Sequence, residues 1–276
     1  MQNWKEKLDE YKKILIREEK SEITIDKYMR DVTAFLSYLG ENVIDKELVV
    51  EYKKNLEEEH FQTSSINSML ASLNSFLVFS GYPECKVKML KVQRKIYSEE
   101  EKELTKDDYM KLLEASRNEK QLNLIFQTIC STGIRVSELK YFTVEGIRKK
   151  KFCVQCKNKI RTIFVPNKLR TMLINYAKEK DIRSGCIFVT KNGNPLDRSN
   201  IWKRMKKICE KAGVNPSKVF PHNFRKLFAK LFYEMNKDIA KLADLLGHGS
   251  IETTRIYIMT TGSEHCSQIE KLGLII

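Results

Sequence analysis

The 276-residue sequence lacks the features that mark secreted and membrane proteins. It has no apolar run near the roughly 18 residues that span a bilayer. Its start, MQNWKEKLDEYKK, has no hydrophobic signal-peptide core. Its seven cysteines are odd in number and scattered, which does not suggest a disulfide framework in a chain without an export signal. We therefore expect a cytoplasmic protein with reduced thiols and no contact with a membrane.

Signatures of several cofactor-dependent enzymes are also missing. The sequence contains no GxxxxGK[ST] loop for nucleotide phosphates and no acidic cluster for two metal ions. Cys153 and Cys156 form a single CxxC, but no second pair lies at zinc-finger spacing, so we expect these cysteines on a strand of a hairpin. The sequence thus predicts neither a cofactor nor a metal site.

Positive charge is abundant and unevenly placed. The formal net charge is +14, yet residues 1–100 hold 16 Lys and Arg against 18 Asp and Glu, and residues 101–276 hold 34 against 18. Such a surplus favours a polyanionic partner through Coulomb attraction and the release of counterions from phosphates. A generic solubilising charge would give the same composition, so the motifs have to decide between the two.

Amphipathic periodicity predicts a helical domain over residues 1–82. Apolar residues recur at spacings of three and four in SEITIDKYMRDVTAFLSYLG, where Gly40 supplies a stop, and in TSSINSMLASLNSFLVFSG. We expect four short helices joined by brief loops. Residues 83–102 lose this periodicity and contain Pro83 and runs of charge, which predicts an extended linker.

Residues 103–276 predict a second domain of mixed structure. In LTKDDYMKLLEAS, Thr105 followed by Asp108 indicates a capped helix start, and a buried helix near 119–130 runs into the turn STGIR. Apolar alternation on both sides of KNK in RKKKFCVQCKNKIRTIFVP predicts a two-stranded hairpin. The expected fold class is mainly α with a small β-sheet. Further helices are expected over 166–180, 197–212, 222–235, 237–246 and 250–258.

Two segments carry polar residues suited to an anion. Arg135 lies at a predicted helix N-terminus, where a cation opposes the helix dipole, so either a bound anion or an ion pair with Glu138 would account for it. His222 and Arg225 lie three residues apart at the start of PHNFRKLFAKLFYEM, on the flank of its apolar stripe. An imidazole and a guanidinium at a helix start suit a phosphate, although such pairs are also common on ordinary helices.

A further histidine and a tyrosine lie in LGHGSIETTRIYI. His248 projects from a glycine-flanked turn, and Tyr257 follows nine residues later, on what is expected to be a helix. In order, STGIRVSEL, a basic hairpin, HNFR, LGH and this tyrosine resemble the tyrosine recombinase (phage integrase) family. The resemblance spans nearly the whole chain and is closest to short Xer-type and transposon-borne members without an arm-binding domain. It implies a four-helix, SAM-like core-binding domain followed by a catalytic domain.

The resemblance implies a centre for DNA strand transfer. Tyr257 would attack a DNA phosphate, form a 3′-phosphotyrosine and release a 5′-hydroxyl; an ordinary phenol has a pKa of about 10, so it needs assistance. Arg135 and Arg225 would clamp the non-bridging oxygens as charge builds up in the transition state. His222 would assist proton transfer from the tyrosine, and His248 would hydrogen-bond the transferring phosphate.

Supporting residues follow from the same resemblance. Glu138 matches the acidic position that supports the first arginine. A hairpin lysine would protonate the 5′-oxygen, but CKNKIR lacks the glycine-rich turn of many members, so Lys157 is favoured and Lys159 is the alternative. Lys226 also departs from the pattern, because many relatives have a histidine there. A basic run ahead of the hairpin would contact DNA phosphates: Arg148, Lys149, Lys150 and Lys151.

The implied partner is double-stranded DNA with inverted-repeat core sites, bound at the nucleoid. A homo-tetramer would recombine it, with a Holliday junction as the intermediate. The apolar tail QIEKLGLII would dock into a neighbouring protomer. Two other functions stay open. A regulatory DNA-binding protein of the same fold would not need the intact residue set, and a type IB topoisomerase would not need the separate N-terminal domain.

Overall fold

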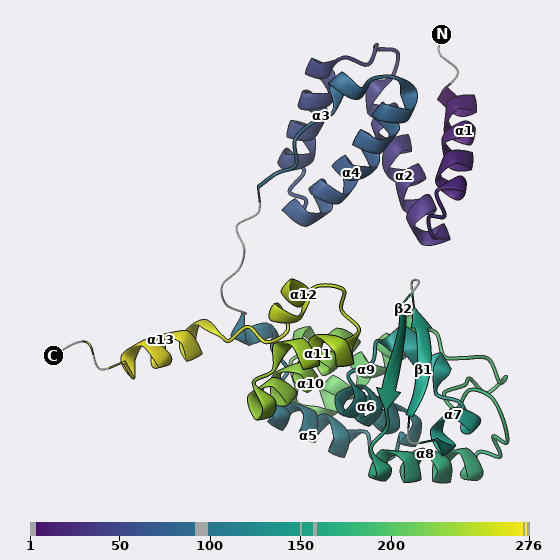
Figure 1. Cartoon of the computed structure of the whole chain (residues 1–276), viewed down its shortest axis with the longest axis vertical. Helices are drawn as coiled ribbons and strands as arrows, with labels where there is room; N and C mark the ends of the chain where they lie inside the picture. Colours follow the sequence, from purple (N-terminus) through teal and green to yellow (C-terminus); the bar gives the residue numbers. More distant parts are fainter. Residues whose placement is uncertain (1–3, 92–98, 150, 157–158, 273, 275–276) are drawn as a thin grey trace. The chain divides into compact units, whose positions relative to one another are not determined.

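The computed structural model describes residues 4–91, 99–149, 151–156, 159–272 and 274 (Figure 1). The chain divides into two compact units, Met1–Arg94 and Lys95–Ile276. Each unit encloses its own hydrophobic core, so each has its own source of stability. No helix within the described residues is both long enough and apolar enough to cross a membrane.

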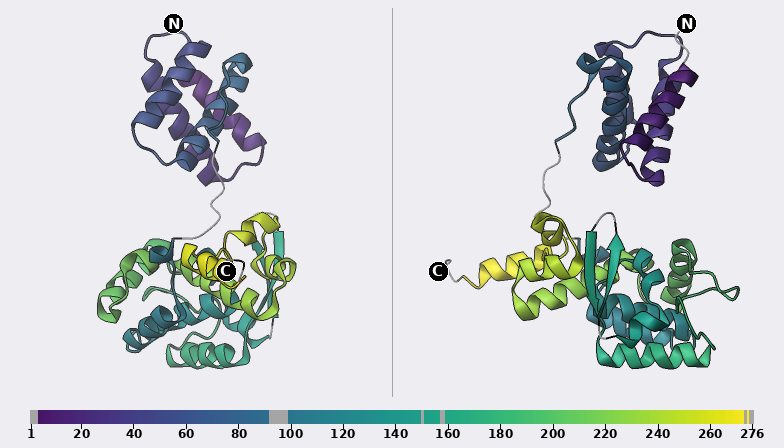
Figure 2. Two further views of the ribbon diagram at one scale, coloured as in Figure 1. Left: turned by 90° about the vertical axis from the view of Figure 1, so that its left-hand side faces the viewer. Right: turned by 45° about the vertical axis from the view of Figure 1, so that its right-hand side comes forward.

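The first unit is helical, as the periodicity of its sequence predicted. Its helices are packed together in both views of Figure 2: α1 (Trp4–Arg17), α2 (Glu22–Leu39), α3 (Lys46–Glu58) and α4 (Thr63–Ser80). Side-chain oxygens begin two of these helices. Ser21 accepts the Thr24 N–H at α2, and Asp45 accepts the Leu48 N–H at α3. Such caps satisfy N–H groups that have no partner inside the helix.

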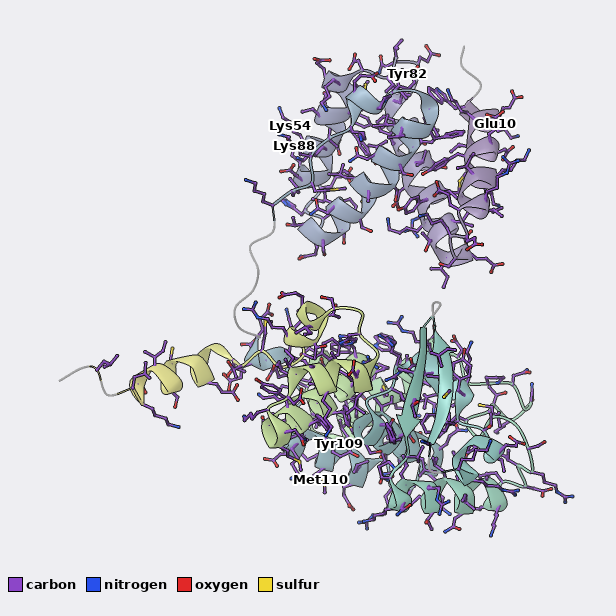
Figure 3. All side chains as sticks on the ribbon, in the orientation of Figure 1. Glu10, Lys54, Tyr82, Lys88, Tyr109 and Met110 are labelled. Carbon is purple, nitrogen blue, oxygen red and sulfur yellow. The ribbon has the colours of Figure 1, made fainter. Side chains whose placement is uncertain are left out.

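The chain stays attached to the first unit after α4, through η1 (Pro83–Cys85) and the residues that follow. The Val87 N–H donates to Asn74 Oδ1 at 3.0 Å, and Lys53 Nζ donates to the carbonyl of Lys88 (labelled in Figure 3) at 3.0 Å. Residues 83–91 therefore belong to the packed unit, whereas the loss of helical periodicity predicted a linker from residue 83. Polar side chains hold the backbone of this segment, and Cys85 and Val87 are buried in the core, but neither kind of contact gives a helical spacing of apolar residues.

The second unit surrounds one large core. Phe126 stacks on Phe224 with ring centroids 4.8 Å apart, and Tyr109 (labelled in Figure 3) meets the edge of Phe224 at 6.3 Å. The predicted capping box is formed, since Thr105 Oγ1 accepts the Asp108 N–H at 3.0 Å. The longer helices are α5 (Lys106–Ala115), α6 (Lys120–Thr132), α8 (Asn167–Glu179), α9 (Arg198–Ala212) and α10 (Pro221–Asn236).

The predicted hairpin consists of β1 (Lys151–Cys156) and β2 (Lys159–Phe164), paired antiparallel with Val154 opposite Arg161. Val154 and Ile163 are buried, whereas Cys153 and Phe164 are exposed, so the two strands cover the core with one face. The fold class, mainly α with a small sheet, is confirmed.

The shorter elements of the second unit are η2 (Glu100–Lys102), η3 (Val136–Tyr141), α7 (Val144–Arg148), η4 (Pro216–Lys218), α11 (Ile239–Leu246), α12 (Ile251–Arg255) and α13 (Gly262–Glu270).

One helix prediction was wrong at its end. The pattern predicted a helix over 250–258 that would contain Tyr257, but α12 ends at Arg255 and Tyr257 lies in the turn that follows. The Tyr257 N–H bonds to the Thr254 carbonyl at 2.9 Å, a contact of the tighter i→i−3 kind. The tyrosine is therefore positioned by a turn and by its neighbours.

Candidate active site

Three predicted residues lie around the ring of Tyr257, and a fourth, Arg135, lies close to them. The ring centroid of Tyr257 lies 4.8 Å from that of His222, in the first turn of α10, and 4.9 Å from that of His248, just after α11. The Arg225 guanidinium carbon is 5.9 Å from the same ring. Arg135, the residue before η3, lies close enough that its charge lowers the pKa of Arg225.

Arg225 occupies the centre of this group and is only 1% exposed. It donates to the carbonyl of Gly133, at the end of α6, at 2.5 Å and to the carbonyl of Leu246, at the end of α11, at 2.6 Å. The partial negative charge of two helix C-termini thus stabilises the cation. Burial, assisted by the charges of Arg135 and Arg161, lowers the pKa of Arg225 to about 10. The guanidinium therefore remains positively charged at neutral pH.

Two glycines give these helix ends the required shape. Gly133 and Gly247 follow α6 and α11 with φ of +62° and +63°, the left-handed conformation that turns the chain and that side chains disfavour. Space is short at both positions as well. A Cβ on Gly133 would overlap the Phe228 ring, and a Cβ on Gly247 would lie 2.5 Å from Arg161 Cδ.

His248 is held in one tautomer by its two partners. Arg225 Nη2 lies 3.0 Å from His248 Nε2, and because a guanidinium can only donate, Nε2 is the acceptor. The ring proton is therefore on Nδ1, which donates to Thr254 Oγ1 at 2.9 Å. Burial, reinforced by the charge of Arg225 and then of Arg135, lowers the pKa of His248 to about 4. The imidazole is neutral at pH 7.

Tyr257 has one end in the core and one end at the polar group. It is 7% exposed and shares a small apolar cluster with Ala229, Leu242 and Leu246. Its hydroxyl lies 3.3 Å from His222 Nδ1. Burial, followed by the charge of the neighbouring Arg225, lowers the pKa of His222, so this imidazole is also neutral at pH 7 and can accept a proton.

Glu138 is fully buried and organises the other side of the site. Its Oε2 accepts the backbone N–H of Arg135 at 2.7 Å, and its Oε1 accepts Arg135 Nη1 at 3.2 Å. The ion pair between Arg135 and Glu138 that the sequence left open is thus present. Burial alone would raise the pKa of Glu138, but the charges of Arg161 and Arg135 outweigh it and lower the pKa. The side chain of Arg135 keeps 38% of its surface exposed, so it can still meet an anion.

Arg161 belongs to the site but was not among the residues predicted from the sequence. This residue lies on β2, is 8% exposed, and donates from Nη2 to Glu138 Oε2 and from Nη1 to the carbonyl of Leu245. A signal was present in the sequence, because strand alternation puts residue 161 on the same inward face as Ile163. A charged residue at a position that faces the core needs a buried partner.

The predicted hairpin lysine and basic run are only partly described. Lys157 and Lys150 lie outside the described residues, and the backbone of Lys159 pairs with Cys156 next to the turn. The rest of the basic run is exposed around the start of β1: Arg148, Lys149 and Lys151. In the part of the chain that is described, no three His, Cys, Asp or Glu side chains gather closely enough to hold a metal ion.

Family models identify the class to which this chain belongs. Residues 102–263 match the model of the Phage integrase family, and residues 8–80 match that of the Phage integrase, N-terminal SAM-like domain. The chain therefore belongs to the phage integrase family and is an enzyme of the tyrosine recombinase type. Site-specific DNA recombination is the activity that this membership supports, and the predicted family is confirmed.

Individual relatives cover almost the whole chain. Tyrosine recombinase XerA of Pyrococcus furiosus is 31% identical over 278 residues, which cover 98% of this chain and 95% of the relative. Tyrosine recombinase XerD of Oceanobacillus iheyensis is 26% identical, covering 87% of this chain and 89% of the relative. Among solved structures, a lambda integrase dimer bound to a COC′ core site superposes with a TM-score of 0.73 at 18% identity. That match covers 92% of this chain and 76% of the integrase, and it shows the shared fold.

Proposed function

We propose that the protein cuts and rejoins DNA strands through a 3′-phosphotyrosine formed at Tyr257. The observation that carries this proposal is the placement of the Tyr257 hydroxyl 3.3 Å from a neutral His222, with Arg225 beside the ring. A phenol needs a nearby base to attack at neutral pH, and phosphate needs cations around it. Both requirements are met by the same small group of side chains.

In the proposed step, each bond change and each proton transfer is assigned to a residue. The Tyr257 oxygen forms a bond to phosphorus while its proton passes to His222, and the bond from phosphorus to the 5′-oxygen breaks. Arg135 and Arg225 bind the non-bridging oxygens. His248 can donate to the phosphate in its other tautomer, with the proton on Nε2 and the Thr254 hydroxyl donating to Nδ1. Arg225 can contribute its Nε–H, a buried donor that has no acceptor among the described residues. Joining is the reverse step, in which a 5′-hydroxyl attacks the phosphotyrosine.

The 5′-oxygen needs a proton as it leaves. We assign this general acid to Lys157, with Lys159 as the alternative, on the resemblance to the family. Proton transfer of this kind contributes about 10²–10⁴-fold to a rate. Exchanging each lysine for alanine and comparing the cleavage rates will decide between them. A loss confined to the Lys159 variant would contradict the preference for Lys157.

The proposed substrate is double-stranded DNA with inverted-repeat core sites, recombined by a tetramer through a Holliday junction. A lambda integrase tetramer bound to a Holliday junction has the same fold as this chain, with a TM-score of 0.71 at 19% identity, and this supports the assembly. The exposed cations Arg148, Lys149 and Lys151, together with Lys150, would contact DNA phosphates.

The C-terminal tail is proposed to join the protomers. Ile269 and Leu272, in and just after α13, are 65% and 64% exposed, which is a liability unless a partner covers them. We expect the double variant Ile269→Asp, Leu272→Asp, and a chain truncated after residue 265, to bind single sites but not to form the tetramer. Glu270→Gln is the matched control at a neighbouring polar position. Tetramers of undiminished stability in gel-shift assays would disprove this role.

The nucleophile can be tested directly. The probe is a nicked duplex, selected from a random-sequence library by binding to the full chain. After cleavage, the short fragment between the cut and the nick, which carries the new 5′-hydroxyl, diffuses away. Wild type and Tyr233→Phe, which removes another hydroxyl near the same cluster, are expected to give a covalent protein–DNA adduct, and Tyr257→Phe none. An adduct with Tyr257→Phe would refute the assignment. Binding without any adduct from wild type would favour a regulatory protein.

A further inference from the structure

We propose that Arg161 is a positioning residue that sets the spacing between the two halves of the anion site. One half consists of Arg135 and the carboxylate of Glu138 that holds it. The other half consists of Arg225 and His248 at the end of α11. This proposal rests on the proposed strand-cleavage function.

The contacts of Arg161 reach the first half directly. Its Nη2 donates to Glu138 Oε2, the same oxygen that accepts the backbone N–H of Arg135 at 2.7 Å. Its Nη1 points to the other half and donates to the Leu245 carbonyl. A guanidinium is a rigid planar fork, so two acceptors bound to its two ends are held at a fixed separation.

The second half is fixed through the backbone of α11. Arg161 binds the carbonyl of Leu245, and Arg225 binds the carbonyl of the next residue, Leu246, at 2.6 Å. The turn at Gly247 then leads to His248. Arg161 also packs against this turn, because a Cβ on Gly247 would come within 2.5 Å of Arg161 Cδ and 3.4 Å of its Nε. A shift of Arg161 would therefore move the helix end that orients both Arg225 and His248.

Arg161 is not placed to bind DNA itself. Both terminal nitrogens of its guanidinium donate to protein oxygens, and one of these belongs to the Glu138 carboxylate, which neutralises the cation. Arg225 is as deeply buried but donates only to neutral groups. Arg135, by contrast, keeps 38% of its side chain exposed. The role of Arg161 is thus exerted through other residues. Its charge also adds to the positive field of the site, since it lowers the pKa of both Arg225 and His248.

A purely structural role for Arg161, as an anchor of β2, has to be distinguished from control of the anion site. The charge of the substrate makes this possible. On a phosphodiester, two negative non-bridging oxygens must be neutralised in the transition state by correctly spaced donors. In a methylphosphonate, a methyl group replaces one of these oxygens, so neutralisation matters less. Misplaced donors should therefore slow cleavage of the phosphodiester more than cleavage of the methylphosphonate.

The experiment measures the rate of adduct formation on the nicked duplex described above, with either linkage at the cleavage position. The variants are Arg161→Met, which keeps the stem over Gly247, and Arg161→Lys, which has one nitrogen for two acceptors. Thr162→Val, the next residue on the outer face of β2, is the matched control. We expect Arg161→Met to lose about 10–100-fold on the phosphodiester, because misplacements near 1 Å can cost about 10²-fold.

On the methylphosphonate we expect the same variant to lose less than about fivefold relative to wild type, with duplex affinity unchanged, since only the transition-state contacts are affected. Arg161→Lys is expected to fall between, and Thr162→Val to match wild type. If Arg161→Met does not fold by circular dichroism, Arg161→Lys supports the same comparison.

Equal losses on both linkages would overturn the proposal in favour of a merely structural role, and so would full activity of both Arg161 variants. Failure of the underlying function looks different. In that case wild type itself would form no adduct on either linkage, whereas a failure of this inference alone leaves wild-type cleavage intact and dependent on Tyr257.

Discussion

At the scale of single residues, the environment of His222 makes it a base that works at neutral pH. Its folded pKa lies below 6.5, so the imidazole stays neutral until the solution is more acidic than that value. Protonation removes the lone pair that accepts the tyrosine proton. We expect the rate of adduct formation to be independent of pH just above neutrality and to fall on acidification, with an apparent pKa below 6.5. Stopped assays between pH 4.5 and 8 will measure this profile.

The variant His222→Gln tests whether His222 causes this fall in rate on acidification, the acid limb of the pH profile. It keeps a hydrogen-bonding side chain but cannot titrate, so the limb should disappear and the rate at pH 7.5 should fall by about 10²-fold or more. If the limb persists unchanged in His222→Gln, another group controls it. His248, whose pKa is lowered to about 4, would then be the residue to examine at the acid end of the range.

Glu138 is the residue whose loss should cost the most stability. Glu138→Gln removes the charge that two arginines share and leaves Arg161 buried without a counter-charge, close to the half-exposed Arg135. Breaking a buried ion pair from one side costs about 3–5 kcal/mol, and the amide recovers part of this through hydrogen bonds. We therefore expect a loss of about 2–4 kcal/mol in urea unfolding at pH 7. Glu114→Gln, in an exposed pair with Arg117, should change stability by less than about 0.5 kcal/mol.

The pH dependence of that stability has a defined sign. Because the pKa of Glu138 is lowered on folding, the unfolded chain binds its proton first as the solution is acidified. The stabilisation is therefore complete above the unfolded pKa and is lost as pH falls through the folded one. The difference in unfolding free energy between wild type and Glu138→Gln should shrink from pH 7 toward pH 3. A difference that does not vary with pH would contradict this explanation.

The motif residues were predictable, and so was Glu138 as the support of Arg135, but the contacts that join the two halves of the site were not. Arg135, His222, Arg225, His248 and Tyr257 could be found because their order along the chain is specific. Strand alternation marks Arg161 as facing inward, but its partners were not predictable, because its two acceptors, Glu138 and the Leu245 carbonyl, are 23 and 84 residues away in sequence. Carbonyl acceptors leave no mark in a sequence at all, since every residue has one.

At the scale of elements, glycine-ended helices shape the site, and the chain provides a matched pair to test this. Gly133 and Gly213 end α6 and α9 with nearly equal φ, +62° and +61°. A Cβ at Gly213 would meet nothing within 4 Å, whereas a Cβ at Gly133 would come 2.6 Å from Phe228 Cε1. Both Ala variants should lose about 1 kcal/mol to backbone strain, and Gly133→Ala about 1–3 kcal/mol more to overpacking.

Activity separates these two variants further. The carbonyl of Gly133 accepts Arg225 Nη1, so a displaced Gly133 should slow adduct formation, while Gly213→Ala should cut DNA at the wild-type rate. Thermal unfolding and the adduct assay together check both parts. Equal destabilisation by the two substitutions would mean that the ring of Phe228 moves aside at little cost.

Elements were predicted well where apolar periodicity was strong and poorly where polar contacts decide. The helices of the first unit and the hairpin strands follow their patterns. Residues 83–91 follow none, because amide side chains such as Asn74 hold their backbone. Tyr257 lies two residues beyond the end of α12, in a turn where its N–H bonds to the carbonyl of Thr254. The spacing of apolar residues predicts neither the packing of residues 83–91 nor the end of α12 before Tyr257.

At the scale of the whole molecule, the excess of positive charge does not by itself identify the anionic partner. After residue 100 the chain has 34 basic residues and 18 acidic ones, and this excess of positive charge is compatible with any polyanion. Buried ion pairs such as Arg161 with Glu138 use a few of these charges for internal order. Most of the others that the structure describes are exposed, and such a surface attracts a DNA backbone as it attracts other polyanions.

The salt dependence of DNA binding tests this reading. The logarithm of the association constant should fall linearly with the logarithm of salt concentration, by about 0.9 for each phosphate neutralised. Exchanging Arg148, Lys149 and Lys151 for Gln should reduce this slope by about 2–3. Three exposed cations at the opposite end of α8, Lys178, Lys180 and Arg183, change net charge equally and serve as the control. Fluorescence anisotropy between about 50 and 200 mM salt gives both slopes. Equal reductions in the two triple variants would show that net charge, and not a defined contact surface before the hairpin, drives binding.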